Sequence, residues 1–112
     1  MTPDYLDYVE DILDAMEKAE IILEGIRYED YETDFRINFA VIRALEIISE
    51  ASKRIPEDLR ESTPNIPWKG MSGMRDRIIH GYDNIDYQII WDVVKKDIPK
   101  IKPLIQKNLK DY

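Results

Sequence analysis

The sequence predicts an all-α protein, an antiparallel four-helix bundle with one short extra helical turn. Three observations lead to this fold class. Apolar residues recur at steps of three and four, no segment alternates apolar and polar residues over the length of a strand, and the connection between the first two periodic stretches is short. A chain of 112 residues is long enough for one hydrophobic core. We therefore expect a single helical domain over residues 1–112.

The first helix begins with strong start signals and carries one continuous apolar seam. Thr2 can cap it, Pro3 suits the first helical position, and Asp4 complements the helix dipole. Gly25 favours its end. The alternating steps of four and three predict a buried, coiled-coil-like seam. Its residues are Tyr5, Val9, Ile12, Met16, Ala19, Leu23 and Ile26.

A second helix is predicted from about Tyr31 to Arg54, antiparallel to the first because the connection is short. Its apolar stripe is wide, which indicates contact with more than one neighbouring helix. The stripe consists of Phe35, Phe39, Ile42, Leu45, Ile48 and Ala51, widened by Ile37, Val41, Ala44 and Ile47.

A segment rich in proline follows. Pro56 can open a one-turn helix, whereas Pro64 and Pro67 favour an extended path. A third, shorter helix is expected from Trp68 to Ile79. Two glycines inside it each lower helix stability by about 1 kcal/mol relative to alanine.

The last helix is expected after a turn over residues 81–86, with Asp86 as its N-cap. Pro99 falls inside this helix and removes a backbone donor, so we expect a kink or a break near Asp97. The apolar seam of this helix consists of Tyr87, Trp91, Val94, Ile98, Ile101 and Ile105.

Composition excludes several classes of protein. The absence of cysteine excludes disulfides and thiolate metal sites. No run approaches the roughly 20 apolar residues of a membrane-spanning helix, and the N-terminus does not resemble a signal peptide, so we expect a cytoplasmic protein without a membrane partner. A net charge of −7 argues against a broad nucleic-acid-binding surface but leaves room for a small basic site.

The most informative segment holds the only histidine of the chain, His80, five residues after Arg75 and two before Tyr82. Histidine can transfer protons near neutral pH, and arginine can hold a phosphate through two hydrogen bonds. On one helix the two side chains would lie about 140° apart. They can converge if the helix ends near Ile79 and the chain turns at Gly81. The segment therefore suggests chemistry at a phosphate.

RNA fits such a site because it carries its own nucleophile, the 2′-hydroxyl. Cleavage then requires a base, an acid and a cation, but neither a metal ion nor a cofactor. Arg77 could add positive charge beside Arg75. Because His80 cannot act as base and acid at the same instant, a nuclease of this kind would be a homodimer that brings two copies of the site together.

A purely structural interpretation explains the same residues. His80 could be a helix C-terminal residue whose charge suits the dipole, and Tyr82 could fill a groove between helices. Arg75 could pair with Glu46 or Glu50 of the second helix, or with the adjacent aspartate. Short motifs often match by chance, so the spacing alone favours this interpretation.

The wider sequence changes that balance. Arg75, His80 and Tyr82 match the signature RxxxxHxY, and the chain resembles the HepT-like proteins of the HEPN superfamily. The resemblance covers nearly the whole chain. It includes residues 41–51 for the second helix, 66–68 and 73–75 for the approach to the motif, and 89–91 and 97–99 for the last helix.

The resemblance implies a metal-independent RNA endonuclease toxin of a type VII toxin–antitoxin system, acting as a homodimer on RNA rather than DNA. Its partner would be an MNT-type nucleotidyltransferase antitoxin that adds AMP to the signature tyrosine. Carried onto this sequence, Arg75 and His80 would be catalytic and Tyr82 would be AMPylated. Asp76 and Arg77 would support the site.

Two positions depart from the pattern of the family. Asp76 stands where a polar residue, often asparagine, is usual, and Gly81 stands where many relatives carry a polar or charged residue. Two further interpretations remain open. One is a non-catalytic helical binding module that engages a nucleotidyltransferase or a nucleotide, and the other is a structural bundle with a degenerate site. RNA cleavage that depends on His80 would distinguish the nuclease from both of these interpretations.

Overall fold

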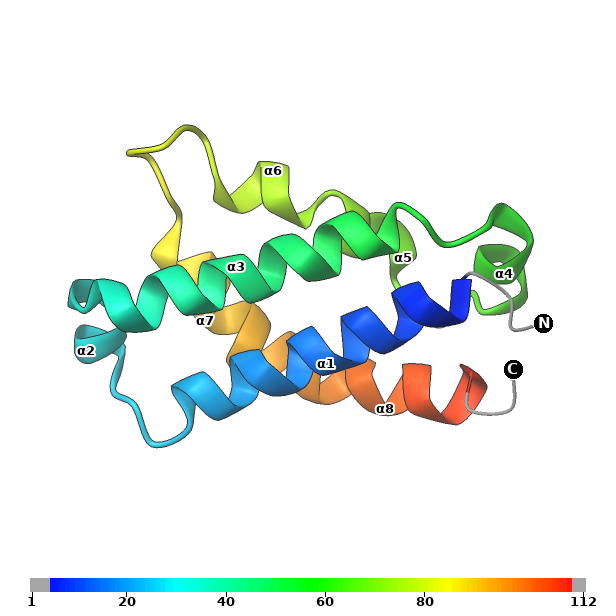
Figure 1. Ribbon diagram of the computed structural model, residues 1–112, viewed down its shortest axis with the longest axis horizontal. Helices are drawn as coiled ribbons and strands as arrows, with labels where there is room; N and C mark the ends of the chain where they lie inside the picture. Colours follow the sequence, from blue (N-terminus) through cyan, green and yellow to red (C-terminus); the bar gives the residue numbers. More distant parts are fainter. Residues whose placement is uncertain (1–4, 110–112) are drawn as a thin grey trace.

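The computed structural model describes residues 5–109, which form helices joined by short connections (Figure 1). The long helices α1 (Tyr5–Leu23) and α3 (Phe35–Ser52) lie side by side and antiparallel. In this part of the chain the only β pairing is one isolated bridge, and no helix is both long and apolar enough to cross a membrane. The predicted all-α fold class is confirmed.

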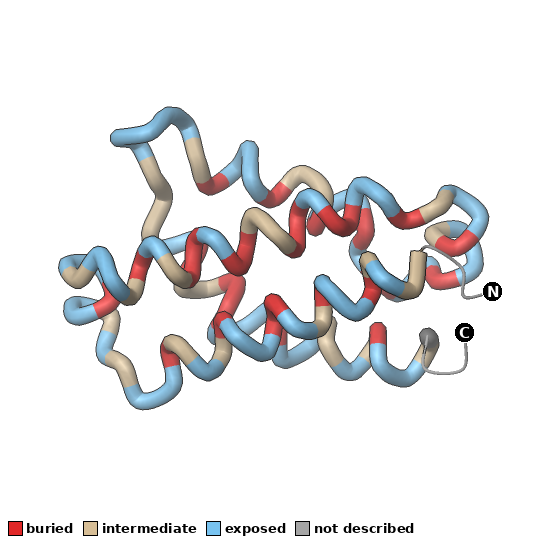
Figure 2. Tube along the Cα trace, in the orientation of Figure 1, coloured by how far each residue is buried: buried red, intermediate tan, exposed pale blue. Residues whose placement is uncertain are grey.

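The apolar seam of α1 is buried as its spacing predicts. Five of the seven expected residues are buried and the two at its ends are half-buried. In Figure 2 the buried stretches of α1 and α3 face each other across the bundle. Gly25 has a φ of 71° just after the helix ends, which suits its expected role as a stop signal. The predicted start signals at residues 2–4 lie outside the described residues.

The prediction of one helix from Tyr31 to Arg54 is wrong at its start, because the chain forms α2 (Tyr28–Thr33) and then α3. Asp34 lies between them, and its carboxylate accepts a hydrogen bond from the backbone N–H of Arg36 at 3.0 Å. This bond caps α3 and separates it from α2. The buried Asn38 amide donates to two carbonyl oxygens of α2 at 3.1 and 3.2 Å, which closes the end of that helix.

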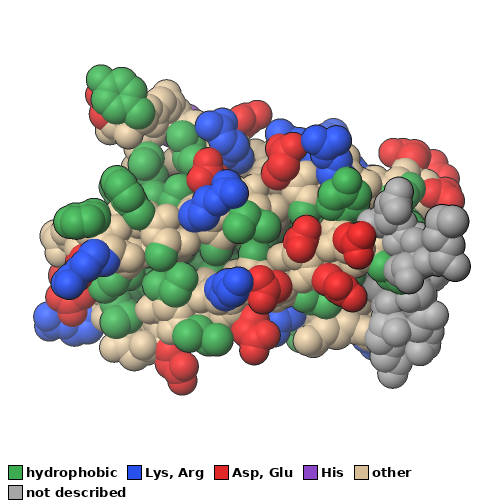
Figure 3. Space-filling model, viewed as in Figure 1, with side chains coloured by type: hydrophobic (Ala, Val, Ile, Leu, Met, Phe, Trp, Pro, Cys, Tyr) green, Lys and Arg blue, Asp and Glu red, His purple; other side chains and the backbone are tan. Residues whose placement is uncertain are grey.

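The first part of the predicted α3 stripe is not in the core. Phe35 and Phe39 are each 65% exposed, and their rings pack edge to face with centroids 5.9 Å apart. The stripe is wider than the surface that the neighbouring helices cover, so its N-terminal part faces solvent. Hydrophobic side chains gather over this part of α3 in Figure 3. The rest of the stripe is buried, at Ile42, Leu45, Ile48 and Ala51.

The segment between α3 and the motif also differs in detail from its prediction. The one-turn helix is present as α4 (Glu57–Ser62). Residues 64–66 form a turn instead of the predicted extended path. The third helix is present in two pieces, α5 (Trp68–Ser72) and α6 (Met74–Ile78), which are divided at Gly73. A glycine at this position weakens the helix, so two short helices replace the predicted one.

The last helix begins as predicted. Asp86 caps α7 (Tyr87–Asp92) by accepting a hydrogen bond from the backbone N–H of Ile89 at 3.2 Å. The buried Tyr31 hydroxyl donates to the backbone oxygen of Tyr87 at 2.8 Å and so joins α2 to the start of α7. Burial raises the pKa of the Tyr31 phenol well above its ordinary value, so the group stays protonated as the donor.

The expected irregularity near Asp97 is a π-helical turn, η1 (Val93–Asp97), and the chain then continues without a break into α8 (Ile98–Leu109). A π turn shifts the backbone hydrogen bonds by one residue, which accommodates the donor missing at Pro99. Lys95 in this turn donates from Nζ to the backbone oxygen of Leu23 at 2.9 Å. The irregular turn therefore also ties α8 to the end of α1.

Candidate functional site

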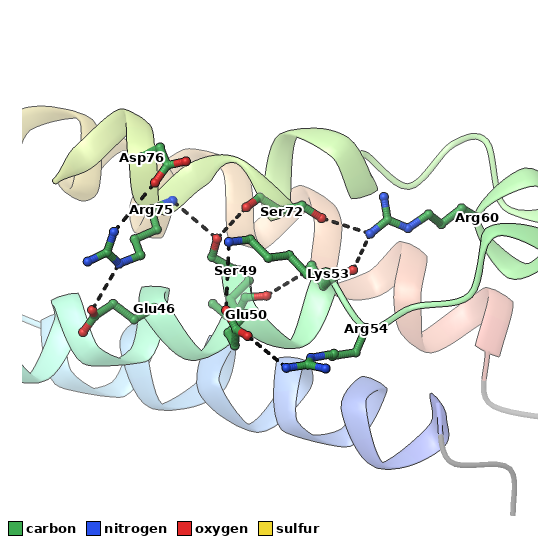
Figure 4. Close-up of polar contacts among 11 residues, drawn as sticks. Glu46, Ser49, Glu50, Lys53, Arg54, Arg60, Ser72, Arg75 and Asp76 are labelled. Atoms are coloured by element: carbon green, nitrogen blue, oxygen red, sulfur yellow. Dashed lines mark hydrogen bonds and ion pairs between the residues drawn. The ribbon is translucent and has the colours of Figure 1, made fainter. Parts of the chain in front are cut away.

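Arg75 lies on α6 and reaches toward α3, with about half of its side chain exposed (Figure 4). Its Nε lies 3.6 Å from the Glu46 carboxylate, and its Nη1 lies 3.7 Å from the Asp76 carboxylate. Glu50 instead pairs with two cations at the C-terminal end of α3. Both contacts of Arg75 are longer than a hydrogen bond. The carboxylates therefore orient the guanidinium by charge, and its N–H donors make no hydrogen bond with any described residue.

Ser49 holds the backbone at the start of α6. It is buried on α3, donates from Oγ to the backbone oxygen of Ser72 at 2.8 Å, and accepts from the backbone N–H of Arg75 at 3.4 Å. One hydroxyl thus joins α3 to the end of α5 and to the start of α6, as Figure 4 shows. The role of Ser49 was not among the predictions from the sequence. The sequence does carry one signal for it: Ser49 is a polar residue on the apolar side of the predicted second helix, where a buried hydroxyl needs a hydrogen-bond partner.

Arg60 fixes the same junction from the α4 side. Its Nη2 donates to the backbone oxygen of Ser52 at 2.6 Å and to Oγ of Ser72 at 3.1 Å. Its Nε donates to the backbone oxygen of Ile55 at 3.2 Å. The position of Arg75 therefore depends on polar contacts that converge on Ser72 from two helices.

We expect Ser49→Ala to lower the free energy of unfolding by about 1 kcal/mol, because it leaves the Ser72 carbonyl without its donor. It should also lower any activity that depends on Arg75. Ser52→Ala is the matched control, because among the described residues that buried hydroxyl bonds only to the backbone oxygen of Ile48, in its own helix, at 2.7 Å. Urea unfolding and an activity assay on both variants test the difference. Equal losses of activity would contradict the positioning role of Ser49.

His80 lies on a hairpin that connects α6 to α7 and projects from the bundle (Figure 1). Residues Ile79 and Ile85 form the antiparallel bridge, and the His80 N–H donates to the Asn84 oxygen at 2.8 Å. Gly81 has a φ of 149°, a conformation that favours glycine. The helix end and the turn that the motif requires are thus both present.

The side chains of the hairpin face solvent. Tyr82 is 96% exposed, so the interpretation that it fills a groove between helices is wrong. His80 is exposed, and its ring makes no hydrogen bond or ion pair with residues 5–109. No such bond joins it to Arg75 either. The bundle therefore fixes Arg75 but leaves both hairpin side chains accessible.

The two supporting residues of the motif are placed differently. Asp76 contacts the Arg75 guanidinium and is itself exposed. Arg77 turns away, because its Nη2 donates to the backbone oxygen of Gly70 at 3.1 Å. Of these two residues, Asp76 therefore contacts the Arg75 side chain and Arg77 does not.

The fold and this site define a class: an all-helical protein that presents an oriented arginine and an accessible histidine at the end of a short helix. The chain matches the family model described as Ribonuclease HepT-like over residues 12–108. It belongs to this family of HepT-like ribonucleases, as its signature residues indicate.

Curated relatives agree with the family. A protein named "Probable ribonuclease HepT" from Thermococcus cleftensis is 47% identical over 107 residues, which cover 96% of this chain and 97% of that protein. A protein from Methanocaldococcus jannaschii, whose name describes it as an RNase, is 42% identical to this chain. The match covers 96% of this chain and 84% of that protein. Another from Caldanaerobacter subterraneus is 39% identical, with 91% of each chain covered. No solved structure matches the chain.

Proposed function

We propose that this protein is the metal-independent RNA endonuclease toxin of a type VII toxin–antitoxin system, acting as a homodimer. An MNT-type nucleotidyltransferase would neutralise it by AMPylation of Tyr82. The observation that carries the proposal is the Arg75 guanidinium, which is oriented by two ion pairs and donates no hydrogen bond to residues 5–109. Five residues further on, His80 is exposed to solvent, and its ring has no partner among the residues that the structure describes.

These two residues suit cleavage of RNA by its own 2′-hydroxyl. Arg75 would bind the scissile phosphate and stabilise the charge that develops on it. His80 of one copy would remove the proton of the 2′-hydroxyl, whose oxygen attacks phosphorus. His80 of the other copy would protonate the departing 5′-oxygen. The products are a 2′,3′-cyclic phosphate and a 5′-hydroxyl, so atoms and charge balance without a co-reactant.

A second copy of the chain is part of the proposal, since each copy contributes only one histidine. Phe35 and Phe39 support this, because an exposed pair of aromatic rings packed edge to face is the kind of patch that an interface covers. Both residues belong to the first turns of α3, and this end of α3 lies at the end of the molecule from which the hairpin projects (Figure 1). A twofold contact through this patch would place the hairpins of the two copies in equivalent positions about the dimer axis.

Two measurements test the role of the arginine: the rate of RNA cleavage by Arg75→Ala in excess chelator, and the affinity of Asp76→Asn for RNA. Arg75→Ala should lower the rate by about 10²–10³-fold, as loss of a transition-state donor does. Asp76→Asn should tighten RNA binding by about two- to fivefold, because one exposed charge at 4 Å contributes about 1 kcal/mol. Glu57→Gln on α4 is the control for net charge. An Asp76→Asn protein that binds RNA like Glu57→Gln would show that Asp76 does not act on the phosphate.

The antitoxin step predicts modification at one tyrosine. Incubation with a cognate nucleotidyltransferase and ATP should add the mass of one AMP to the peptide that contains Tyr82. The added phosphate would repel RNA from the site, so cleavage should fall in proportion to labelling. Tyr82→Phe should remain unlabelled, whereas Tyr28→Phe, which lacks a half-buried tyrosine on α2, should be labelled normally. Undiminished labelling of Tyr82→Phe would place the modification elsewhere.

A further inference from the structure

We propose that the groove between α5–α6 and η1–α8 binds a nucleotide of the RNA strand next to the scissile phosphate. This assignment rests on the proposed function and adds a substrate subsite to it. The groove has a volume of about 300 Å³, at the lower end of the range for small-ligand sites. Its apolar floor and polar rim come from both segments: Met71, Met74, Val93 and Ile101 are apolar, and Arg77, Asp97 and Lys100 are charged.

The charges of the chain are sorted in a way that the net value of −7 hides. Residues 1–66 contain 17 acidic and 7 basic side chains, a net charge of −10. Residues 67–112 contain 6 acidic and 9 basic side chains, a net charge of +3. Both walls of the groove come from this second part. The fold therefore places the groove on the portion of the chain that attracts a polyanion.

The two cations at the rim have no anionic partner within residues 5–109. In this range Arg77 bonds only to a backbone oxygen, and Lys100 makes no hydrogen bond or ion pair. Several other cations do have carboxylate partners, as Lys102 has in Glu20 at 2.6 Å. An unpaired arginine and lysine over an apolar floor can hold a phosphate while the floor packs against a base.

Asp97 gives the bound nucleotide a direction. Its carboxylate repels a phosphate, so the phosphate belongs beside Arg77 and Lys100 and the base lies toward Asp97. A carboxylate accepts hydrogen bonds from the amino groups of bases. An apolar protein segment would also fit the floor, but it would leave the two cations without partners. RNA fits both parts of the groove, because its base can pack on the apolar floor and its phosphate can pair with the two cations.

The groove lies within reach of the cleavage motif. Arg75 and Arg77 are two residues apart on α6, which places them about 200° apart around the helix axis. A strand with one phosphate at Arg75 needs to cross only the width of a helix, about 10 Å, to enter the groove. The subsite would therefore take a nucleotide close to the cut rather than a distant one.

The test uses a single-stranded 2′-O-methyl RNA, which cannot be cleaved by its own 2′-hydroxyl, and measures the Kd at several salt concentrations by fluorescence anisotropy. Lys100→Ala should weaken binding by about three- to tenfold and reduce the slope of log K against log salt by about 0.7. Lys18→Ala is the matched control, because it removes an exposed lysine paired with Asp14 on acidic α1. It should leave both quantities near the wild-type values.

Equal binding and equal slopes for Lys100→Ala, Arg77→Ala and Lys18→Ala would overturn the groove assignment. The proposed function would still stand if the wild-type protein cleaves ordinary RNA in a His80-dependent way. Conversely, selective loss of binding in Lys100→Ala by a protein that never cleaves RNA would support the groove and refute the nuclease. The two failures are therefore distinguishable.

Discussion

Replacing His80 with alanine is expected to lower RNA cleavage by about 10²–10⁴-fold, the contribution of general acid–base catalysis. The free energy of unfolding should not change, because the ring is exposed and has no partner among the described residues. The hairpin bond from the His80 N–H to the Asn84 oxygen involves only the backbone and is retained. Initial rates on a defined RNA and urea unfolding curves measure the two quantities.

Asn84→Ala is the matched control for this variant, since it changes an exposed side chain on the same hairpin. It should cleave RNA at close to the wild-type rate. Full cleavage by a folded His80→Ala protein, purified free of contaminating RNase, would refute the nuclease. If no variant and no wild-type preparation cleaves RNA, but the protein binds a nucleotidyltransferase, the non-catalytic binding module is the correct interpretation.

The double variant Phe35→Ser, Phe39→Ser should be monomeric and should lose cleavage to the level of His80→Ala. Both rings are mostly exposed in the single chain, so the change should alter the stability of the monomer by no more than about 0.5 kcal/mol. A dimer that buries the rings would lose that apolar contact, and each site would lose the second histidine. Sedimentation velocity at micromolar concentration, together with a cleavage assay, measures both effects.

Ile21→Ser is the control for this experiment, because Ile21 is a comparably exposed apolar residue on α1. It should leave mass and cleavage unchanged. A double phenylalanine variant that remains a dimer with full activity would show that the copies meet elsewhere. A fully active wild-type monomer would refute the need for a second histidine.

Periodicity predicted the fold class and the core of α1, because local steps of four and three determine which face a helix buries. It did not predict the break at Asp34. The Asp34 side chain caps α3 and so ends α2, although the helical spacing of apolar residues continues through this position. Periodicity also placed Phe35 and Phe39 in a buried stripe. Whether a stripe is covered depends on where the neighbouring helices lie, which spacing alone does not determine. Pro99, by contrast, marked the irregular turn because its effect is local.

The candidate site was predictable where it depends on adjacent residues. The motif spacing identified Arg75, His80 and Tyr82, and the family it indicates is confirmed. The role of Ser49 was not predictable, since its bond to Ser72 joins residues 23 positions apart. From the sequence, Glu46 was only one of several possible partners of Arg75. The structure selects it because α3 and α6 pack against each other.

The most direct test of the central claim is the chemistry of the cut ends. Wild-type protein in excess chelator is incubated with an RNA oligonucleotide and with its fully 2′-O-methylated counterpart, and the products are analysed by mass spectrometry. Cleavage by Arg75 and His80 predicts 2′,3′-cyclic phosphate and 5′-hydroxyl ends from the RNA and an intact methylated strand. Cleavage of the methylated strand, or ends that carry a 5′-phosphate, would contradict attack by the RNA's own hydroxyl.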